Sequence, residues 1–489
     1  MSQINLTSLP VELFEKILED LEISDILRLK LLDRQAYQVI CCSENIKYRV
    51  ELFLAGFEDG NHYNLAKRQQ FLRTYQSNWD SLVPQKTTNI PILHHRIYEL
   101  AGGIYGFVPD STPNSVRFYR LPSVSRGIEM EEWSVQDLDF PIDDFTMEEA
   151  YDLLTVFIYK TGHVKVHLLK LSDGKPHPRA RKPLLEYEIP LNHTVHGWEL
   201  EAVIWENKLG CLFTSTSANE SVDALVVWDW TTGDLIRVLP QCGNHSFTFL
   251  NGNTVVAGRS TEDKRPSLAF IDLGSDGNPL ISSRTLVFPN AERGVLWSLR
   301  LNLGIPIRHG PELKLRVPFV VNHSQQILFI TAIFTDSSSR SLAVPLWVLW
   351  SLAQAKTPLV EWKDSEYYSV PVVPGHPHRA CFTMGSRFVA FIEPELPFAA
   401  DSDTAIALVY DLSPRRLMRV GWDSSMPHCE GIPGTWNTVM PTDDDGGFYR
   451  AIRLPGNLPS DVLLTEDSLV VIKRGFYHGS EPFLTVFSF

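Results

Sequence analysis

The sequence predicts a multidomain protein in which a small all-α N-terminal region is followed by an all-β propeller of about seven blades. From the start to residue 82, apolar residues recur at helical spacing, whereas from about residue 97 they alternate with polar residues in short runs. A third observation is a recurring mark in the β part, an apolar strand that ends in a polar turn. We place the domains at residues 1–44, 45–96 (helical connector and linker) and 97–489 (propeller).

The first predicted helix begins at Pro10. Proline fits the first turn of a helix because its missing N–H has no partner there, and Glu12 lies where the helix dipole favours an anion. Apolar residues then follow at i, i+3, i+4 and i+7, while the opposite face is charged. These four residues are Phe14, Ile17, Leu18 and Leu21.

Two more short helices are predicted directly afterwards. Ser24 can cap a helix that carries Ile26, Leu27 and Leu29, and Asp33 can cap a third that carries Ala36, Val39 and Ile40. A segment of this size makes a poor core alone and usually needs a partner or another stabiliser.

This stretch resembles the F-box, and the resemblance rests on Leu6–Pro10, Glu12, Ile17–Leu18, Leu21 and Asp25–Leu29. In that family three helices dock onto the Skp adaptor, which links the F-box protein to a cullin-based ubiquitin ligase. The resemblance implies that the following residues contact the adaptor: Leu6, Leu9, Pro10, Ile17, Leu18, Leu21, Ile26, Leu27 and Leu29.

The third helix departs from the family pattern. There the family continues with a small apolar residue, Cys, Arg and Trp, whereas this chain has Leu32, Asp33, Arg34 and Tyr37. The alternative is that residues 6–42 form an amphipathic helical cap packed on the rest of the chain.

Two longer helices are predicted for the connector. One carries an apolar stripe of Ile46, Val50, Phe53 and Phe57, and the other one of Leu65, Leu72, Tyr75, Trp79 and Leu82. They form either a rigid stalk or a layer packed on the downstream domain. Pro84 and Pro91 break helix and mark a boundary at residues 84–96.

The β part repeats one strand-and-turn mark seven times. The clearest copy is Val227–Asp234, which resembles the strand and turn that close a blade in WD-repeat proteins. The seven marked strands are Val116–Leu121, Val164–Leu171, Ala224–Trp230, Leu268–Leu273, Pro345–Leu352, Ile406–Leu412 and Leu484–Phe489.

Hairpins precede several of these strands, as expected for propeller blades. They are predicted at 200–213, 247–256, 318–330 and 380–391. Seven marks favour seven blades and leave six or eight open. We expect Leu484–Phe489 to complete a blade begun near residues 97–107 and so to close the ring. A pair of β-sandwich domains is the competing architecture.

Composition limits the partners and the compartment. A net charge of −14 argues against a nucleic-acid partner, which needs clustered Lys and Arg. Six cysteines without a C-x-x-C pair argue against a zinc ribbon or a disulfide framework, and no apolar run is long enough for a membrane span. We therefore expect a soluble chain, without a membrane partner, in the cytoplasm or the nucleus.

The sequence carries few of the patterns that mark catalytic or metal sites. No nucleophile elbow, P-loop, zinc-protease or kinase signature occurs, so we expect a non-catalytic chain without metal or cofactor. His94-His95 and His376-Pro377-His378 are the nearest approach to metal ligands. The acidic stretches 129–152 and 443–445 could bind Ca²⁺ or a basic partner, although neither has the spacing of a calcium loop and solvated loops are commoner.

The interpretation favoured by these patterns is a substrate receptor. The N-terminal helices would hold the Skp adaptor, and through it a cullin, while propeller loops bind an unknown target protein. The combination is similar to a large group of F-box proteins in mushroom-forming fungi. Two alternatives stay open: a Skp-bound scaffold without a ligase role, and a propeller enzyme or small-molecule binder with a helical cap.

Overall fold

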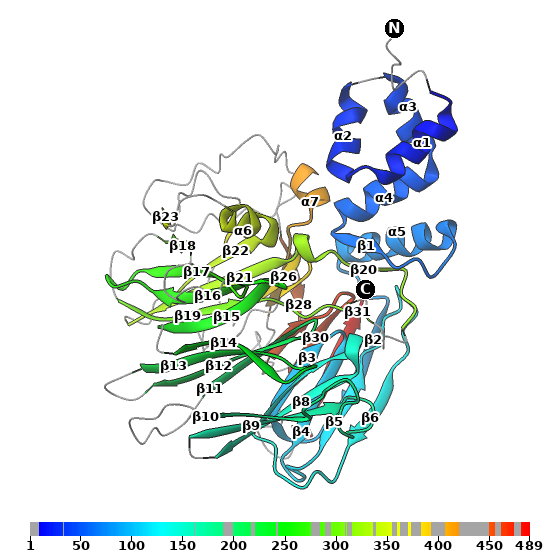
Figure 1. Cartoon of the computed structure of the whole chain (residues 1–489). Coiled ribbons are helices and arrows are strands. Elements are labelled where there is room, and N and C mark those ends of the chain that lie inside the picture. The colour runs from blue at the N-terminus through cyan, green and yellow to red at the C-terminus, as the bar shows by residue number, and fades with distance from the viewer. Residues whose placement is uncertain are drawn as a thin grey trace, which may run out of the picture.

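The computed structural model shows an N-terminal helical region followed by a seven-bladed β-propeller, so the predicted fold class is confirmed (Figure 1). The structure describes residues 9–32, 34–160, 162–188, 199–216, 221–240, 243–274, 284–288, 295–308, 310, 315–335, 339–354, 359–361, 370–372, 383–392, 406–419, 449–454, 461–473 and 481–489.

Five helices precede the propeller in the described part of residues 9–82: α1 (Val11–Asp20), α2 (Ile23–Leu32), α3 (Arg34–Cys42), α4 (Glu44–Leu54) and α5 (Leu65–Ser81). The first begins at Val11, one residue later than predicted, with Pro10 as its N-cap. Helix α2 begins at Ile23, so Ser24 lies inside the helix and is not the predicted cap. Side-chain caps start the two connector helices, because Ser43 Oγ accepts from the Ile46 N–H and Asn64 Oδ1 from the Lys67 N–H.

Each blade is an antiparallel sheet whose first strand lies nearest the axis. Blade 1 consists of β3 (His95–Ala101), β4 (Ile104–Pro109), β5 (Val116–Arg120) and β6 (Glu131–Val135). Blade 2 consists of β7 (Asp144–Glu148), β8 (Leu153–Lys160), β9 (His163–Lys170) and β10 (Leu184–Glu188). Blade 3 consists of β11 (Glu199–Trp205), β12 (Lys208–Thr216), β13 (Ser221–Asp229) and β14 (Asp234–Pro240).

Blades 4 to 6 follow in chain order. Blade 4 consists of β15 (Asn244–Asn251), β16 (Thr254–Ser260), β17 (Pro266–Asp272) and β18 (Arg284–Val287), with β23 (Leu359–Glu361) added in parallel at its edge. Blade 5 consists of β19 (Leu296–Asn302), β21 (Ile327–Phe334), β22 (Ser339–Pro345) and β24 (Val370–Val372). Blade 6 consists of β25 (Thr383–Met384), β26 (Arg387–Ile392), β27 (Ile406–Asp411) and β28 (Tyr449–Arg453).

Blade 7 closes the ring by joining distant parts of the chain. Three strands come from the C-terminal part, namely β29 (Asp461–Leu464), β30 (Ser468–Lys473) and β31 (Phe483–Ser488). The fourth is β2 (Lys86–Pro91), which pairs with β31 from Lys86↔Ser488 to Pro91↔Phe483. The predicted closure with residues 97–107 is therefore wrong, because those residues belong to blade 1, and the closing strand lies in the segment predicted to be linker.

The recurring strand-and-turn mark is the third strand of a blade in six of the seven predicted positions. In the copies that contain an aspartate at the end of the strand, its carboxylate can accept hydrogen bonds from the turn that follows. Asp229 Oδ1 accepts from the N–H groups of Thr231 and Thr232, and Asp411 Oδ1 from that of Ser413.

The fifth mark and one hairpin are predicted incorrectly. Most of Pro345–Leu352 is the helix α6 (Leu346–Ala353), because β22 ends at Pro345 and the apolar residues after it bury one helical face. The segment predicted to pair within 318–330 is β20 (Phe319–Val321), which pairs with β1 (Phe57–Asp59) of the connector instead.

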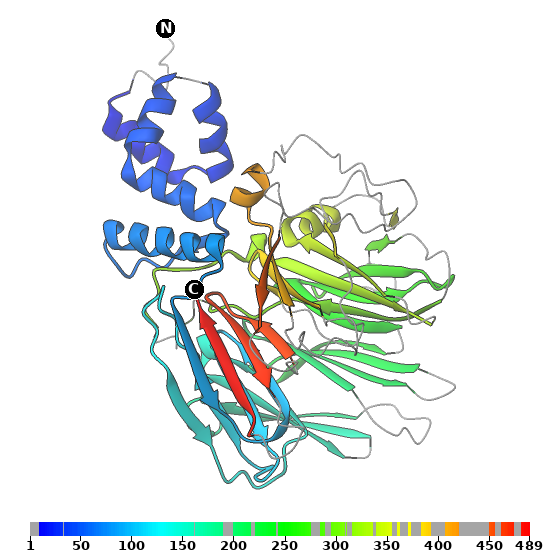
Figure 2. The same cartoon turned by 180° about the vertical axis from the view of Figure 1, so that it is seen from behind.

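The two ends of the propeller differ. Because neighbouring strands of a blade are antiparallel, the turns between first and second strands lie at one end and those between second and third strands at the other. The connector lies against the first set of turns, so we call this the helix end and the opposite one the far end. Figure 2 shows α1–α3 projecting away from the propeller, with α5 beside the ring.

In the part of the chain that the structure covers, no helix combines the length and the apolar composition that a membrane-spanning helix needs.

Candidate functional site

The first three helices form a small core of their own, which we call the tip (α1–α3). Leu18 of α1 and Ile26 of α2 are fully buried, and Phe14 is almost so. Their partners are Ala36, Val39 and Ile40 of α3 and Ile46 and Val50 of α4. This apolar cluster contains no propeller residue, so the tip is not buried against the ring.

Helix α4 joins the tip to the propeller through its two faces. Ile46 and Val50 complete the core of the tip, whereas Tyr48 and Leu52 belong to a large cluster shared with α5 and with blades 6 and 7. Arg49 also donates hydrogen bonds to the carbonyl oxygens of Leu18 and Leu21, at 2.8 and 3.1 Å, and so satisfies acceptors at the end of α1. One helix therefore serves both cores.

The predicted adaptor contacts that the structure describes are buried, exposed or half-buried. Leu18 and Ile26 lie in the core of the tip, so in this conformation they support its surface and do not form part of it. Pro10 is exposed, and Leu6 lies outside the described residues. The others are half-buried, with part of each side chain at the surface: Leu9, Ile17, Leu21, Leu27 and Leu29.

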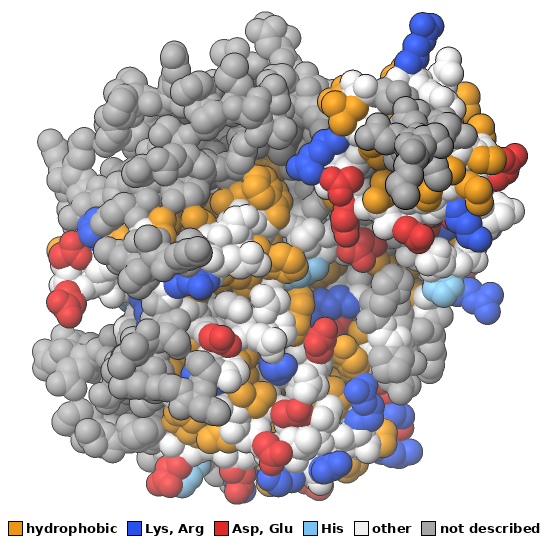
Figure 3. Space-filling model, turned by 45° about the horizontal axis from the view of Figure 1, so that its top comes forward, with side chains coloured by type: hydrophobic (Ala, Val, Ile, Leu, Met, Phe, Trp, Pro, Cys, Tyr) orange, Lys and Arg blue, Asp and Glu red, His pale blue; other side chains and the backbone are white. Residues whose placement is uncertain are grey.

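The tip also exposes large apolar side chains that the sequence interpretation missed. Leu31 and Leu32 are 87% and 80% exposed, and Val11, Leu13 and Tyr37 are about half exposed. Figure 3 shows hydrophobic side chains gathered on this projecting region. The signal was present in the sequence, because Val11 and Leu13 lie beside the apolar stripe of α1 and two leucines end α2.

The connector is fixed to the ring by a buried polar network around Arg387. Its Nε and Nη2 atoms lie 3.0 and 2.9 Å from Asp411 Oδ2, and it donates to the hydroxyl of Tyr75 on α5. The guanidinium also stacks on the ring of Trp79, 4.7 Å from its centroid. Burial alone would raise the pKa of Asp411, but the Arg387 charge and hydrogen bonds lower it below its ordinary value.

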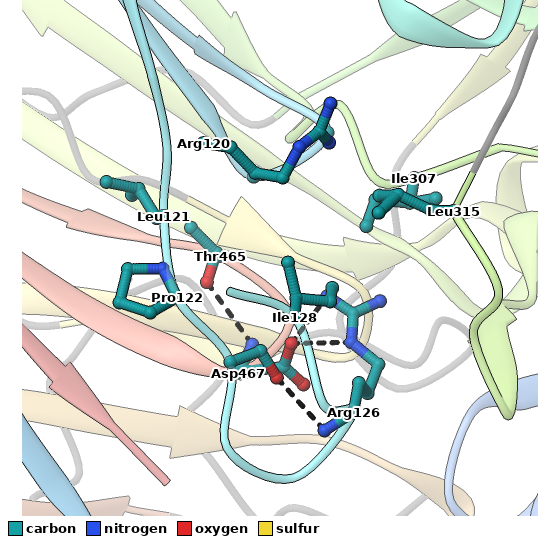
Figure 4. Close-up of a pocket in the computed structure, with 12 residues that line it drawn as sticks. Arg120, Leu121, Pro122, Arg126, Ile128, Ile307, Leu315, Thr465 and Asp467 are labelled. Atoms are coloured by element: carbon teal, nitrogen blue, oxygen red, sulfur yellow. Dashed lines mark hydrogen bonds and ion pairs between the residues drawn. The ribbon is translucent and has the colours of Figure 1, made fainter. Parts of the chain in front are cut away.

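A second buried network lies where blade 7 meets blade 1. Arg126 is 2% exposed, and its Nε and Nη2 atoms both lie 2.5 Å from Asp467 Oδ2. Its Nη2 atom is 3.4 Å from Glu466 Oε2. Figure 4 shows Arg126 and Asp467 at one side of a pocket that Arg120, Ile307 and Leu315 also line. The ion pairs hold the loop after β5 against the turn of blade 7.

Residues 303–310 cross the helix end of the propeller, and we call them the strap; the structure describes 303–308 and 310. The strap belongs to the connection between the first two strands of blade 5, yet it contacts five other blades. The Gly304 N–H donates to Thr383 Oγ1 of blade 6, and the Ile305 carbonyl accepts from the Gly102 N–H of blade 1. The Ile307 N–H donates to Glu466 Oε1 of blade 7. Arg308 Nη1 donates to Glu148 Oε2 of blade 2 and to the Ile204 carbonyl of blade 3.

The strap fits closely against these turns. A Cβ atom on Gly304 would lie 1.8 Å from the Thr383 carbonyl oxygen, so only glycine fits there without movement of the backbone. The guanidinium of Arg308 stacks on Trp205, 4.6 Å from the ring centroid, and His323 lies against the same ring. Burial lowers the pKa of His323 to about 4, so this imidazole is neutral near neutral pH.

The inner strands carry carboxyl groups whose pKa values burial raises strongly. Glu99 Oε1 accepts from Thr146 Oγ1 at 2.8 Å, and Glu201 Oε1 accepts from Ser246 Oγ at 2.9 Å, so each links one blade to the next. Burial raises the pKa of both glutamates to about 8 and that of Asp144 to about 6.

His95, considered above as a metal ligand, uses its ring nitrogens in hydrogen bonds within the protein. His95 is buried, with Nδ1 2.7 Å from the Leu93 carbonyl and Nε2 2.8 Å from the Tyr105 hydroxyl, so both ring nitrogens have partners in the core. Residues 376–378 lie outside the described residues. Within the described ranges, no three His, Cys, Asp or Glu side chains are grouped to hold a metal ion.

Comparison with known proteins gives fold similarity only. No protein-family model and no curated protein matches the sequence. Among solved structures, the chain is similar to Kluyveromyces lactis Hsv2, with a TM-score of 0.36 and 10% identity over 82% of this chain and 98% of that chain. TolB from Acinetobacter baumannii gives a TM-score of 0.32 with 10% identity over 65% and 61% of the two chains. The tricorn protease gives 0.30 with 12% identity over 81% and 38%.

Proposed function

We propose that this chain is the substrate-recognition subunit of a Skp/cullin/F-box ubiquitin ligase. The tip (α1–α3) docks onto the Skp adaptor, and the propeller binds the target protein. The observation that carries the proposal is a projecting helical unit that has its own core, carries the F-box-like sequence and still exposes large apolar side chains.

The exposed apolar side chains favour a protein partner for the tip. A surface with Leu31 and Leu32 more than three-quarters exposed is unfavourable in water, and burial contributes about 1.5–3 kcal/mol for a large aliphatic side chain. Several such side chains can offset the cost of association.

In this function the chain contributes position and no bond chemistry. The partner complex transfers ubiquitin, and the receptor raises the local concentration of the target near the transfer site. The buried Arg387–Asp411 network and the shared core around α4 support such a role, because they fix the connector to the ring. A target on the propeller is then held at a defined distance from the adaptor.

The test is an adaptor pull-down with purified full-length chain. A recombinant Skp adaptor should bind the wild-type chain, and the double substitution Leu9→Ala with Pro10→Ala should remove most of this binding. Pro10 is exposed and Leu9 half-buried, so the folded tip should persist, which circular dichroism checks. The matched control is Leu235→Ala in blade 3, a leucine 52% exposed on a different surface.

Two outcomes would overturn the proposal for the tip. One is a wild-type chain that binds no Skp adaptor, and the other is equal binding by the double variant and the control. A ubiquitination assay with adaptor, cullin and a captured target then separates a ligase receptor from an adaptor-bound scaffold, since only the former supports transfer of ubiquitin.

A further inference from the structure

The helix end of blades 2 and 3 lies away from the connector, which packs on blades 6 and 7. Two turns meet there: residues 171–183, between the third and fourth strands of blade 2, and residues 230–233, between those of blade 3. The structure describes every residue of both turns. The Arg181 N–H donates to the Thr231 carbonyl at 2.8 Å and so joins one turn to the other.

The turn of blade 2 is built on His177, whose side chain is buried. Its Nε2 atom donates to the Tyr151 carbonyl at 2.9 Å, and its Nδ1 atom accepts from the Arg179 N–H at 3.2 Å. A neutral imidazole has one donor and one acceptor nitrogen, so both are used. The ring also lies edge-on to Trp230, with centroids 5.0 Å apart. These contacts fix the backbone of Arg179 against the core of blade 3.

The guanidinium of Arg179 lies over two aromatic rings. It is 5.2 Å from the ring centroid of Tyr151 and 5.4 Å from that of Trp230. Trp230 is fully buried, and its Nε1 atom donates to the Glu206 carbonyl at 2.8 Å, so this ring is itself fixed. Stacking orders the cation while the arginine side chain stays exposed. An arginine that is already ordered loses less conformational entropy when it binds a ligand.

The lysines and the arginines of this turn differ in their partners. Both lysines have a carboxylate partner at 3.6 Å, in the pairs Lys175–Asp173 and Lys182–Asp234. Arg179 and Arg181 are exposed, and among the described residues neither has a carboxylate within ion-pair distance. The unpaired cations are therefore the two whose planar guanidinium groups can hold both oxygens of a carboxylate.

The hydroxyl of Tyr151 adds a neutral donor beside these cations. Arg179 and Arg308 both lie near it, and in the part of the chain that the structure describes it has no hydrogen-bond partner. Glu206 also lies near this hydroxyl, but it forms no ion pair with either arginine within the described ranges. We call Tyr151, Arg179 and Arg181 the arginine surface, and its donors are ordered but lack an acceptor from the described chain.

We propose that the arginine surface binds a segment of the target protein that is rich in Asp or Glu, with carboxylates on the guanidinium groups of Arg179 and Arg181. This inference rests on the proposed function for the identity of the partner. Because the chain has a net charge of −14, an acidic segment is attracted only where unpaired cations gather, so charge complementarity selects this place on the ring. A target bound there lies at the end of the propeller that carries the connector.

The test is fluorescence anisotropy with full-length chain and a fluorescein-labelled octa-glutamate peptide at low salt. The double substitution Arg179→Gln with Arg181→Gln should weaken binding about tenfold, because two ion pairs with the peptide are lost. Arg179 also covers Trp230, so Arg181→Gln alone is a second variant, which should weaken binding about threefold without changing the circular dichroism spectrum. The matched control, Arg73→Gln with Arg96→Gln, removes the same charge from exposed positions of α5 and blade 1 and should keep wild-type affinity.

The result that would overturn the proposal is equal weakening in the two double variants, since this would mean attraction to net charge alone. Absence of peptide binding by the wild-type chain, or wild-type affinity in Arg181→Gln, would overturn it as well. The adaptor pull-down separates this failure from failure of the proposed function. A wild-type chain that captures adaptor but no peptide refutes this inference alone, whereas one that captures peptide but no adaptor refutes the receptor role and keeps the arginine surface as a binding site.

Discussion

The hydroxyl of Tyr75 donates a 2.7 Å hydrogen bond to the carbonyl oxygen of Glu466, so helix α5 is joined directly to the turn that closes the ring. The same hydroxyl accepts from Arg387 of blade 6. Glu466 in turn accepts from the strap and from Arg126. Connector, strap and ring closure therefore share one buried polar centre.

Substitution Tyr75→Phe should lower the free energy of unfolding of the propeller by about 1–3 kcal/mol, because the carbonyl of Glu466 loses a donor in a buried site. Urea denaturation followed by tryptophan fluorescence measures the effect. Tyr37→Phe, at a half-exposed tyrosine of the tip, is the control and should change little. Equal stability of all three proteins would show that the hydrogen bond is not needed.

Substitution Leu18→Ala should destabilise the tip by about 2–5 kcal/mol, because it leaves a cavity in a fully buried site. Hydrogen exchange should become faster in α1–α4 while the blades keep wild-type protection, since the two clusters are separate. Leu31→Ala removes the same atoms from a side chain 87% exposed and should leave exchange unchanged. Faster exchange throughout the blades would contradict the separation.

The stability of the ring should fall as the pH rises from about 5 to 8. Glu99 and Glu201 have pKa values near 8 in the folded chain, above the ordinary 4.5 that applies when unfolded. In this window the unfolded carboxyls release protons that the folded ones retain, so alkali favours unfolding, by at most about 1.4 kcal/mol per pH unit for each group.

The pair Glu99→Gln and Glu201→Gln should flatten this dependence, as urea midpoints at pH 5, 6, 7 and 8 would show. Gln keeps acceptors for Thr146 and Ser246 and has no proton to release. Glu22→Gln, at an exposed position of the tip, should keep the wild-type slope. A double variant with the wild-type slope would rule these two carboxyls out as its source.

A chain shortened to residues 97–489 should fail to form a stable ring. It lacks β2, which supplies six paired residues to β31, and Ile90, which is 1% exposed in the core between blades 7 and 1. It also lacks α5 and so exposes Phe489, whose ring packs against Trp79. Circular dichroism with thermal unfolding should show a cooperative transition for residues 43–489 and none for 97–489. A cooperative transition in the shorter chain would contradict this role for β2.

The fold could be predicted where local pattern and tertiary context agree. Val227–Asp234 is recognisable because an apolar strand must be followed by a side chain that binds the turn, and Asp229 does so. In the same way, the helical stripe of α5 indicated the residues that pack on the ring, including Leu72, Tyr75 and Trp79.

The errors arose where pairing is remote in the sequence. Residues 86–91 were predicted to be linker. A pattern of six residues does not show that they pair with a strand about 400 residues later in the chain. Phe319–Val321 has the composition of a hairpin strand, but its partner is Phe57–Asp59. An almost wholly apolar run such as Leu346–Ala353 is compatible with both a strand and a helix. The structure forms a helix there, which buries Leu346, Leu349 and Leu352.

The candidate site could be predicted only in part, because periodicity separates faces of a helix and does not say which face meets a partner. Ile17, Leu18 and Leu21 lie on one stripe, yet Leu18 is fully buried and the other two are half-buried. The strap gives no sequence signal, since its contacts depend on where five other blades place their turns.

The closure of blade 7 sets an order for events on the ribosome. The tip and α4 emerge early, whereas β2 must wait, unpaired, until β29–β31 have been made. A nascent chain can thus present a folded N-terminal unit long before its ring exists. If a partner captures that unit during translation, it also holds a chain with an unprotected strand edge, and molecular chaperones would be needed at that stage.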